Sequence, residues 1–209
     1  MPALRESATL LLVLLNPFAL SVYLLDLIRT LDTRTFALVS LRAASISGVV
    51  FSAFALTGVA LFEKVLQVRF AAFQIFGGVL FLLIALRFVL TGGRTIEALR
   101  GDQPEHLAGA VAMPFMIGPG TVGASVIIGR RLGLASLLAI ALALAGTVLW
   151  LIASKWLFDH LQSRNARLVA RYVDIVSRVT ALVIGTIAVQ MLLNGWTAWQ
   201  HGSDDLGVR

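Results

Sequence analysis

Cysteine is absent from this 209-residue chain, and charged side chains make up only 13% of it. Without cysteine there is no disulfide, no thiolate nucleophile and no sulfur-ligated zinc site. The three histidines, His106, His160 and His201, do not have the spacing of a metal site. The sequence therefore predicts no metal centre and no bound cofactor, and helix packing has to hold the fold together.

Charge is also missing from six long stretches of the chain, which lie at 7–25, 43–62, 70–86, 107–129, 132–154 and 179–200. The chain is 58% hydrophobic with a mean hydropathy of +0.90, well above a soluble domain. Each stretch approaches or exceeds the roughly 18 to 20 apolar residues that cross a bilayer. A large soluble bundle would need polar stripes at helical spacing, which these stretches lack. We therefore predict an all-α membrane protein with six transmembrane helices.

All eleven acidic residues lie outside these stretches, so no carboxylate is placed to relay protons within the membrane. No paired carboxylates and no Ser, His and Asp set converge there, which argues against an enzyme. Ion coupling would have to use backbone carbonyls, such as that of Ala112, together with Asn, Ser, Thr or Gln oxygens. This chemistry favours sodium over a proton.

The net charge of +6 comes from bases that lie between the apolar stretches, which indicates membrane topology and excludes a nucleic-acid interface. With six spans, six of the 17 Lys and Arg residues fall on the side of the termini and eleven on the opposite side. The positive-inside rule then places both termini outside the cell and the loops after the first, third and fifth helices in the cytoplasm.

Two stretches carry a proline at matching positions, Pro17 and Pro119, which are 102 residues apart. A second similarity, between the sequences at 84–86 and 187–189, has an offset of 103. These two similarities at nearly the same offset predict an internal duplication. In this prediction the first three-helix repeat lies at 1–91, a cytoplasmic linker at 92–106 and the second repeat at 107–209. Because three spans per repeat is an odd number, the two repeats must be inverted in the membrane.

The prolines predict that helices one and four are broken at mid-membrane. Proline fits the first position of a helix, and Asn or Gly suits the cap before it. New half-helices should then run from Phe18 to about Leu27 and from Gly120 to about Gly129. The free amides at such starts attract carboxylates. The predicted substrate-binding residues are Asn16, Pro17, Phe18, Gly118, Pro119, Gly120 and Thr121. The alternative is that both prolines make ordinary kinks, repaired by Ser or Thr.

Three more residues are predicted to line a cavity beside the breaks: Met113, Gln190 and Asn194. Gln190 and Asn194 lie four residues apart on one helix face, and interhelical hydrogen bonding is an equally common use of such a pair. Ala141 and Ala145 have the same spacing, which permits close helix contact either within the bundle or across a homo-oligomer. The sequence leaves both alternatives open.

The break motifs, the run IFGGVLFLLIAL at 75–86 and the run IAVQMLLNG at 187–195 together resemble the MarC family of bacterial and archaeal inner-membrane proteins. The chain departs from the family pattern after Asn16-Pro17, where residues 19–23 supply neither the glycine nor the second proline usual there. The resemblance implies a multi-pass cell-membrane protein of inverted three-helix repeats.

Some members of that family export or take up small neutral amino acids such as glycine and alanine. The expected function is therefore a secondary transporter or exporter of such amino acids, surrounded by membrane lipid. The alternative is a membrane protein that does not transport, with a regulatory or assembly role.

Overall fold

A computed structural model of the chain describes residues 2–58, 67–91, 108–109, 111–112 and 116–204. The predicted linker at 92–106 and Met113 lie outside the described residues. The described elements are all helices: α1 (Pro2–Leu15), α2 (Pro17–Tyr23), α3 (Leu25–Thr30), α4 (Thr33–Thr57), α5 (Phe70–Thr91), α7 (Pro119–Leu132), the 3-10 turn η4 (Gly133–Ala135) and α8 (Ser136–Asp204).

The described helices have the length and composition of a multi-pass membrane protein. Five helical segments are long and apolar enough to cross a membrane: Pro2–Tyr23, Thr33–Thr57, Phe70–Arg87, Pro119–Leu161 and Ala181–Gln200. Large apolar side chains also cover the outside of the molecule, as at Val49 (72% exposed), Leu90 (81%) and Leu134 (77%). Such a surface suits lipid rather than water.

The structure differs from the six-span prediction around the fourth and fifth stretches, which fall partly within one segment, Pro119–Leu161. The chain turns inside this segment because Gly133, with φ of 56°, ends α7. At 14 residues, α7 is too short to cross a bilayer on its own. The fourth predicted span is therefore represented by a short helix that begins at Pro119.

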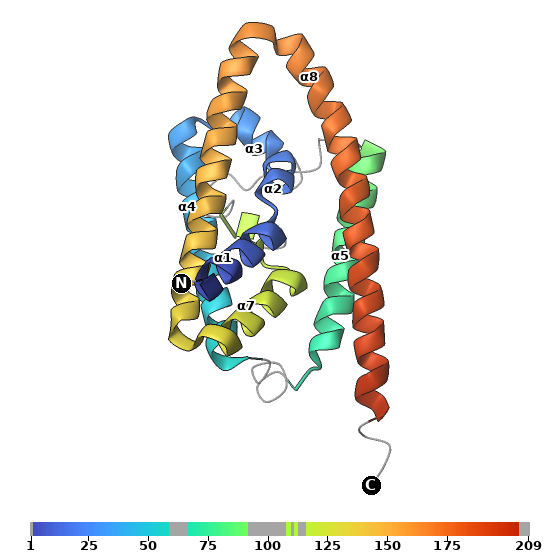
Figure 1. The fold of residues 1–209 in the computed structure, drawn as a ribbon. Coiled ribbons are helices and arrows are strands. Elements are labelled where there is room, and N and C mark those ends of the chain that lie inside the picture. Colours follow the sequence, from blue (N-terminus) through green and yellow to red (C-terminus); the bar gives the residue numbers. More distant parts are fainter. Residues whose placement is uncertain (1, 59–66, 92–107, 110, 113–115, 205–209) are drawn as a thin grey trace.

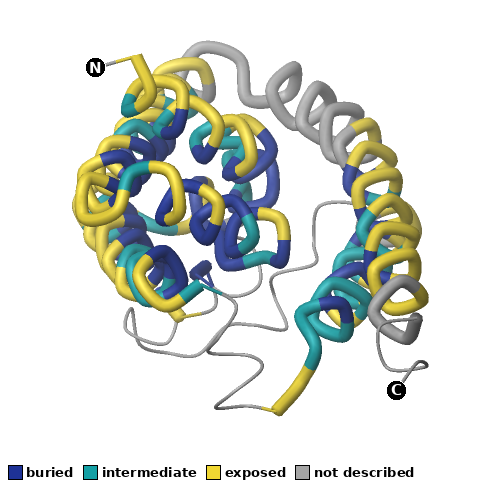
Figure 2. The backbone as a smooth tube through the Cα atoms, turned by 60° about the horizontal axis from the view of Figure 1, so that its bottom comes forward, coloured by how far each residue is buried: buried dark blue, intermediate teal, exposed yellow. Residues whose placement is uncertain are grey.

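The larger part of the molecule is a bundle of α1, α4, α7 and the first part of α8, with α2 and α3 at its upper end (Figure 1). Its core contains the fully buried side chains Leu11, Phe36, Phe51, Val122 and Ile140. Figure 2 shows buried residues gathered inside this bundle and exposed residues on its outer surface. Gly129 of α7 lies directly against the backbone of Ala55 in α4, which brings these two helices into close contact.

The second part of the molecule is a pair made by α5 and the later part of α8. Figure 1 shows α8 rising along the bundle, turning over at the top and descending beside α5. Side chains of α8 are described for 136–161, 179 and 181–200. Gly195 makes the close approach possible, because a Cβ atom there would lie 2.7 Å from Ile75 Cγ1 and 3.0 Å from the Ile75 nitrogen.

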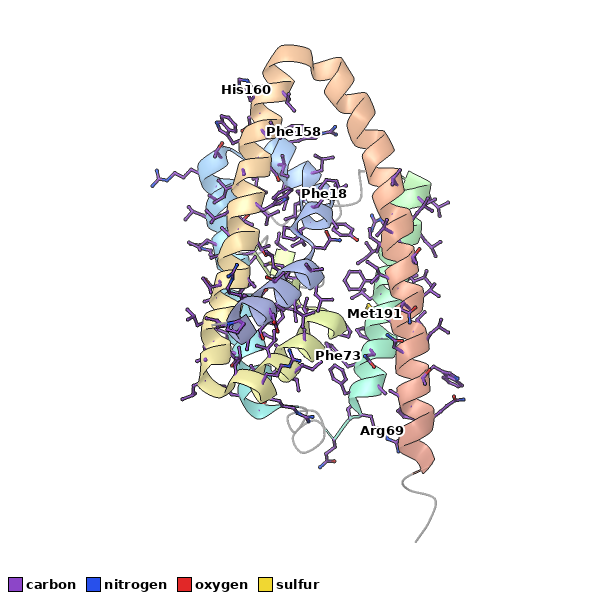
Figure 3. All side chains as sticks on the ribbon, in the orientation of Figure 1. Phe18, Arg69, Phe73, Phe158, His160 and Met191 are labelled. Atoms are coloured by element: carbon purple, nitrogen blue, oxygen red, sulfur yellow. The ribbon has the colours of Figure 1, made fainter. Side chains whose placement is uncertain are left out.

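Contacts between the two parts lie at the start of α7 and along α2, where Ala19 and Tyr23 are buried with Ala85, Ala181 and Ile184. Gly77 of α5 lies against the ring of Pro119, and the ring of Phe81 lies beside Gly118. Phe73 extends from α5 and packs against the core of the bundle (Figure 3). These contacts hold the first turn of α7 against α5 and the later part of α8.

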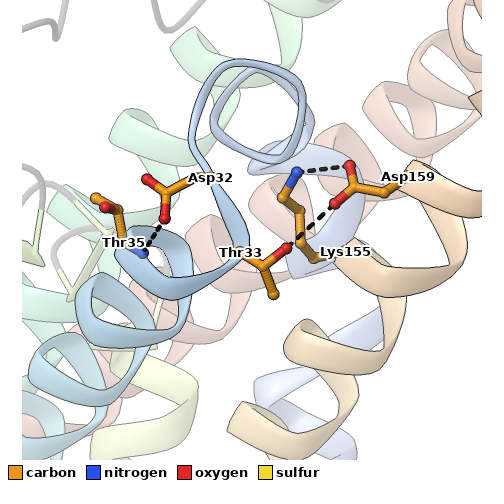
Figure 4. Close-up of polar contacts among 5 residues, drawn as sticks. All are labelled: Asp32, Thr33, Thr35, Lys155 and Asp159. Carbon is orange, nitrogen blue, oxygen red and sulfur yellow. Dashed lines mark hydrogen bonds and ion pairs between the residues drawn. The ribbon is translucent and has the colours of Figure 1, made fainter.

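A polar network ties α3 and α4 to α8 near the top of the molecule. The Thr33 hydroxyl donates to Asp159 at 3.3 Å, and Lys155 Nζ pairs with Asp159 at 2.6 Å (Figure 4). The guanidinium of Arg29 lies 5.9 Å from the ring centre of Phe158. Lys155 is only 4% exposed, so its carboxylate partner is needed to offset the burial of its charge.

Candidate functional site

Asn16 separates α1 from α2 and caps the second of them. Its backbone is left-handed, with φ of 44° and ψ of 70°, a conformation that Asn tolerates better than most residues. Its Oδ1 accepts a hydrogen bond from the Ala19 amide at 3.2 Å. This is the capping role that the sequence predicts for an Asn placed before a proline. The helix that follows is shorter than predicted, because the chain leaves α2 at Leu24 and begins α3 at Leu25.

Gly118 occupies the same place before α7, but it has no side chain with which to cap the helix. The Thr121 hydroxyl supplies part of the cap by accepting from the Gly118 amide at 3.0 Å. The same oxygen lies 2.9 Å from the carbonyls of Met116 and Gly118, to either of which it can donate. Pro119 has no amide hydrogen, and the amides of Gly120 and Thr121 have no acceptor among the described residues.

A cavity of about 310 Å³ lies at this point. Its lining comes from α1, Asn16, α5, the segment before α7, α7 itself and the later part of α8: Val13, Leu14, Asn16, Phe81, Met116, Gly118, Gly120, Thr121, Ile187, Gln190 and Met191. The fold thus brings together five of the residues that the sequence predicts for the site. Gly120 is exposed, and a Cβ atom added there would meet nothing within 4 Å.

The cavity is mainly apolar, with polar side chains at Asn16, Thr121 and Gln190, and no Asp, Glu, Lys, Arg or His belongs to its described lining. Gln190 donates through Nε2 to Asn194 Oδ1 at 2.8 Å, which leaves its own Oε1 available as an acceptor. Amide donors at the start of α7 and an amide oxygen on α8 therefore belong to the same small cavity. This combination suits a ligand that carries an anionic and a cationic group.

Four predicted site residues lie outside the lining of this cavity. Phe18, on α2, is 58% exposed (Figure 3), and Pro17 is half-buried beside it. Pro119 is buried beneath Gly77 of α5, so its role is to begin α7 and support that contact. Asn194 is exposed and reaches the cavity only through its bond to Gln190.

Sequence reasoning missed the apolar part of the lining, including Leu14, Phe81, Met116 and Met191. Met191 lies on the descending part of α8 (Figure 3). In a chain that is 58% hydrophobic, such residues carry no signal that separates a cavity wall from a lipid-facing surface.

The Ala112 carbonyl, which was expected to be open to a sodium ion, accepts a hydrogen bond from the Ile117 amide at 2.9 Å.

The chain is similar to proteins of a described family. Residues 1–200 match the family described as MarC family integral membrane protein. The chain is also 30% identical over 195 residues to the UPF0056 membrane protein MJ1677 of Methanocaldococcus jannaschii, an alignment that covers 87% of this chain and 90% of that protein. No solved structure matches the chain.

Proposed function

We propose that this chain, which belongs to the MarC family of integral membrane proteins, is a secondary transporter. Its proposed substrates are small neutral amino acids such as glycine and alanine. The observation that carries the proposal is the cavity in which the start of α7 meets Asn16, Thr121 and Gln190. A MarC-family protein that served only in regulation or assembly would not need a cavity there with these polar groups in its wall.

The substrate carboxylate binds at the start of α7. The amides of Gly120 and Thr121 lack protein acceptors among the described residues, and the helix dipole adds partial positive charge. The substrate ammonium is held by neutral oxygens, including Gln190 Oε1. Because no charged side chain belongs to the described lining, a ligand with net charge would bind without a counter-charge. The volume of about 310 Å³ favours a small side chain.

The pairing of helices supports the inverted-repeat arrangement as part of this proposal. From the cavity, α2 leads toward the top of the molecule and α7 toward the bottom (Figure 1). Spans that would be equivalent in two repeats also lie together: α1 contacts α7, α4 contacts the earlier part of α8 and α5 its later part. Two half-helices that begin at one cavity with opposite directions are typical of transporters with alternating access.

In this proposal the protein lies in the cell membrane with both termini outside. Since the chain has no native cysteine, single-cysteine labelling tests the orientation directly. A cysteine introduced by Arg34→Cys should react with a charged thiol reagent only after the cytoplasmic side is opened, whereas Lys64→Cys should react in intact cells. Labelling of Arg34→Cys from outside would reverse the orientation.

Uptake by purified protein in proteoliposomes tests the transport function. Labelled glycine, alanine, serine and threonine should be taken up, whereas glutamate, lysine and common antibiotics should not. Uptake measured with a sodium gradient, with a proton gradient and without any gradient identifies the coupling ion. We expect this ion to be sodium. If none of the small neutral amino acids is transported under any gradient, a regulatory or assembly role takes the place of this proposal.

A further inference from the structure

A second cavity, of about 410 Å³, adjoins the proposed substrate cavity along α7. The two cavities share Leu14 and Gly120 in their linings, so they meet at the first turn of α7. Arg130, which also lines the second cavity, lies ten positions after Gly120 in the chain. At about 1.5 Å per helical residue this corresponds to roughly 15 Å. Figure 1 shows α7 running toward the lower end of the bundle, and the second cavity follows this helix from the proposed substrate site to Arg130.

The polar side chains of this second cavity can bind a carboxylate. Arg130 is the charged residue in its described lining, and Gln74 of α5 adds an amide. The remainder of the wall is apolar, with Phe70, Ile127 and Leu10 among its residues. Arg130 is exposed in the last turn of α7, where a cation is favoured by the helix dipole and stays hydrated at the mouth.

We propose that this second cavity is the access route by which an amino acid reaches the start of α7 from the Arg130 side. This inference rests on the proposed transport function. Arg130 attracts the substrate carboxylate at the mouth of the route, and the carboxylate then passes to the uncapped amides at Gly120. Because the Arg130 charge acts before the substrate reaches its site, it raises the capture of substrate without changing the turnover of bound substrate.

The neighbouring arginine provides a matched control for the charge. Arg131 lies in the same last turn and is also exposed, but it is not part of the lining. Arg130→Gln should raise the KM for labelled glycine by about three- to tenfold at low salt with kcat unchanged, as expected for one charge acting close to water. High salt should remove most of this difference because it screens the pair. Equal KM values for Arg130→Gln and Arg131→Gln would overturn the role of Arg130.

Cysteine labelling tests whether the route holds water or lipid. Ile127→Cys, in the route, should react with a charged methanethiosulfonate reagent, and saturating glycine should slow that reaction. Leu138 is as exposed as Ile127, at 53% each, but lies on α8 outside this lining, so Leu138→Cys should remain unreactive in the membrane. Reaction of Ile127→Cys with apolar reagents alone would show a lipid-filled groove and overturn the route.

The two proposals fail in different ways. If the parental protein takes up glycine while both tests at Arg130 and Ile127 are negative, the access route is wrong and the transport function stands. If the parental protein takes up no amino acid, the transport function falls, and the route falls with it as a substrate pathway.

Discussion

The starts of α2 and α7 have similar sequences but differ in the side chain that caps them. Both helices begin with a proline, and both prolines follow a residue that leaves the helical conformation, Asn16 in one case and Gly118 in the other. Asn16 uses its own side chain to bind an amide of the new helix. At α7 the Thr121 hydroxyl turns back to the Gly118 amide, so the amides of Gly120 and Thr121 remain without a described acceptor.

Two helix starts with similar sequences therefore need not be equivalent binding sites. The start of α2 is closed at the Ala19 amide by the Asn16 side chain and leads into a helix of only seven residues. The start of α7 is open, has an exposed glycine and leads into a helix of 14 residues. In our account the first start shapes the cavity and the second one binds the ligand.

Filling the open start should have the largest effect. Gly120→Val places a branched side chain over the amides of α7, and since a Cβ atom there meets nothing within 4 Å, the protein should fold. Uptake of labelled glycine by proteoliposomes should be abolished. Ala141→Val, at an exposed position of α8, should leave uptake near the parental rate. Parental uptake by a folded Gly120→Val protein would reduce both starts to ordinary kinks.

At the start of α2, a negative charge can be introduced at Asn16 while the cap of the helix is kept. Asn16→Asp keeps an oxygen for the Ala19 amide, so thermal stability should stay near parental, but its negative charge faces a bound carboxylate and glycine binding should fall at least tenfold. Asn16→Ala should instead lower the free energy of unfolding by about 0.5 to 2 kcal/mol, through loss of the cap. If Asn16→Asp bound glycine normally, the carboxylate could not lie in this cavity.

Thr121 should contribute to the stability of the start of α7, because its hydroxyl accepts a hydrogen bond from the Gly118 amide. Thr121→Val leaves the Gly118 amide without its hydroxyl partner, which should cost about 1 to 3 kcal/mol of stability. Thr121→Ser retains the hydroxyl and should recover most of that loss, as measured by thermal unfolding in detergent. A Thr121→Ser protein as unstable as Thr121→Val would assign the effect to packing of the methyl group.

The start of α4 should give the smallest effect, since its cap is exposed and lies outside the proposed substrate cavity. Hydrogen bonds from the Thr35 side chain and then from its amide lower the pKa of Asp32 below 3.8. The folded protein therefore favours the carboxylate, and this contribution is present above pH 4 and lost as the pH falls through the lowered value. Asp32→Asn should flatten the loss of thermal stability below pH 4 and leave glycine uptake at neutral pH unchanged.

Proline and its neighbours predicted the starts of α2 and α7 well, because their effect on the backbone is local. The sequence also predicted the third and sixth spans, since α5 and the later part of α8 follow their apolar stretches. The second uncharged stretch, at 43–62, did not give the start of its helix. The fourth helical element, α4, begins at Thr33, where Asp32 caps it, ten residues before the predicted start, and Arg34 and Arg42 lie exposed along it.

Long-range contacts were beyond what the sequence could predict. Lys155 is buried within α8 because Asp159 lies one turn later and Thr33 of α4 reaches the same carboxylate. The placement of Phe81 beside Gly118 likewise depends on how α5 packs against α7. Such contacts join residues far apart in the chain and leave no periodic signal.

We propose that the open start of α7 binds the carboxylate of the substrate. Calorimetric titration of the purified protein with glycine and alanine, and with their amides, tests it most directly, because the amides keep the ammonium and lose the carboxylate. Both amino acids should bind to the parental protein, glycinamide and alaninamide should not, and none of the four should bind to the Gly120→Val protein. Equal affinity for glycine and glycinamide, or parental affinity in Gly120→Val, would contradict it.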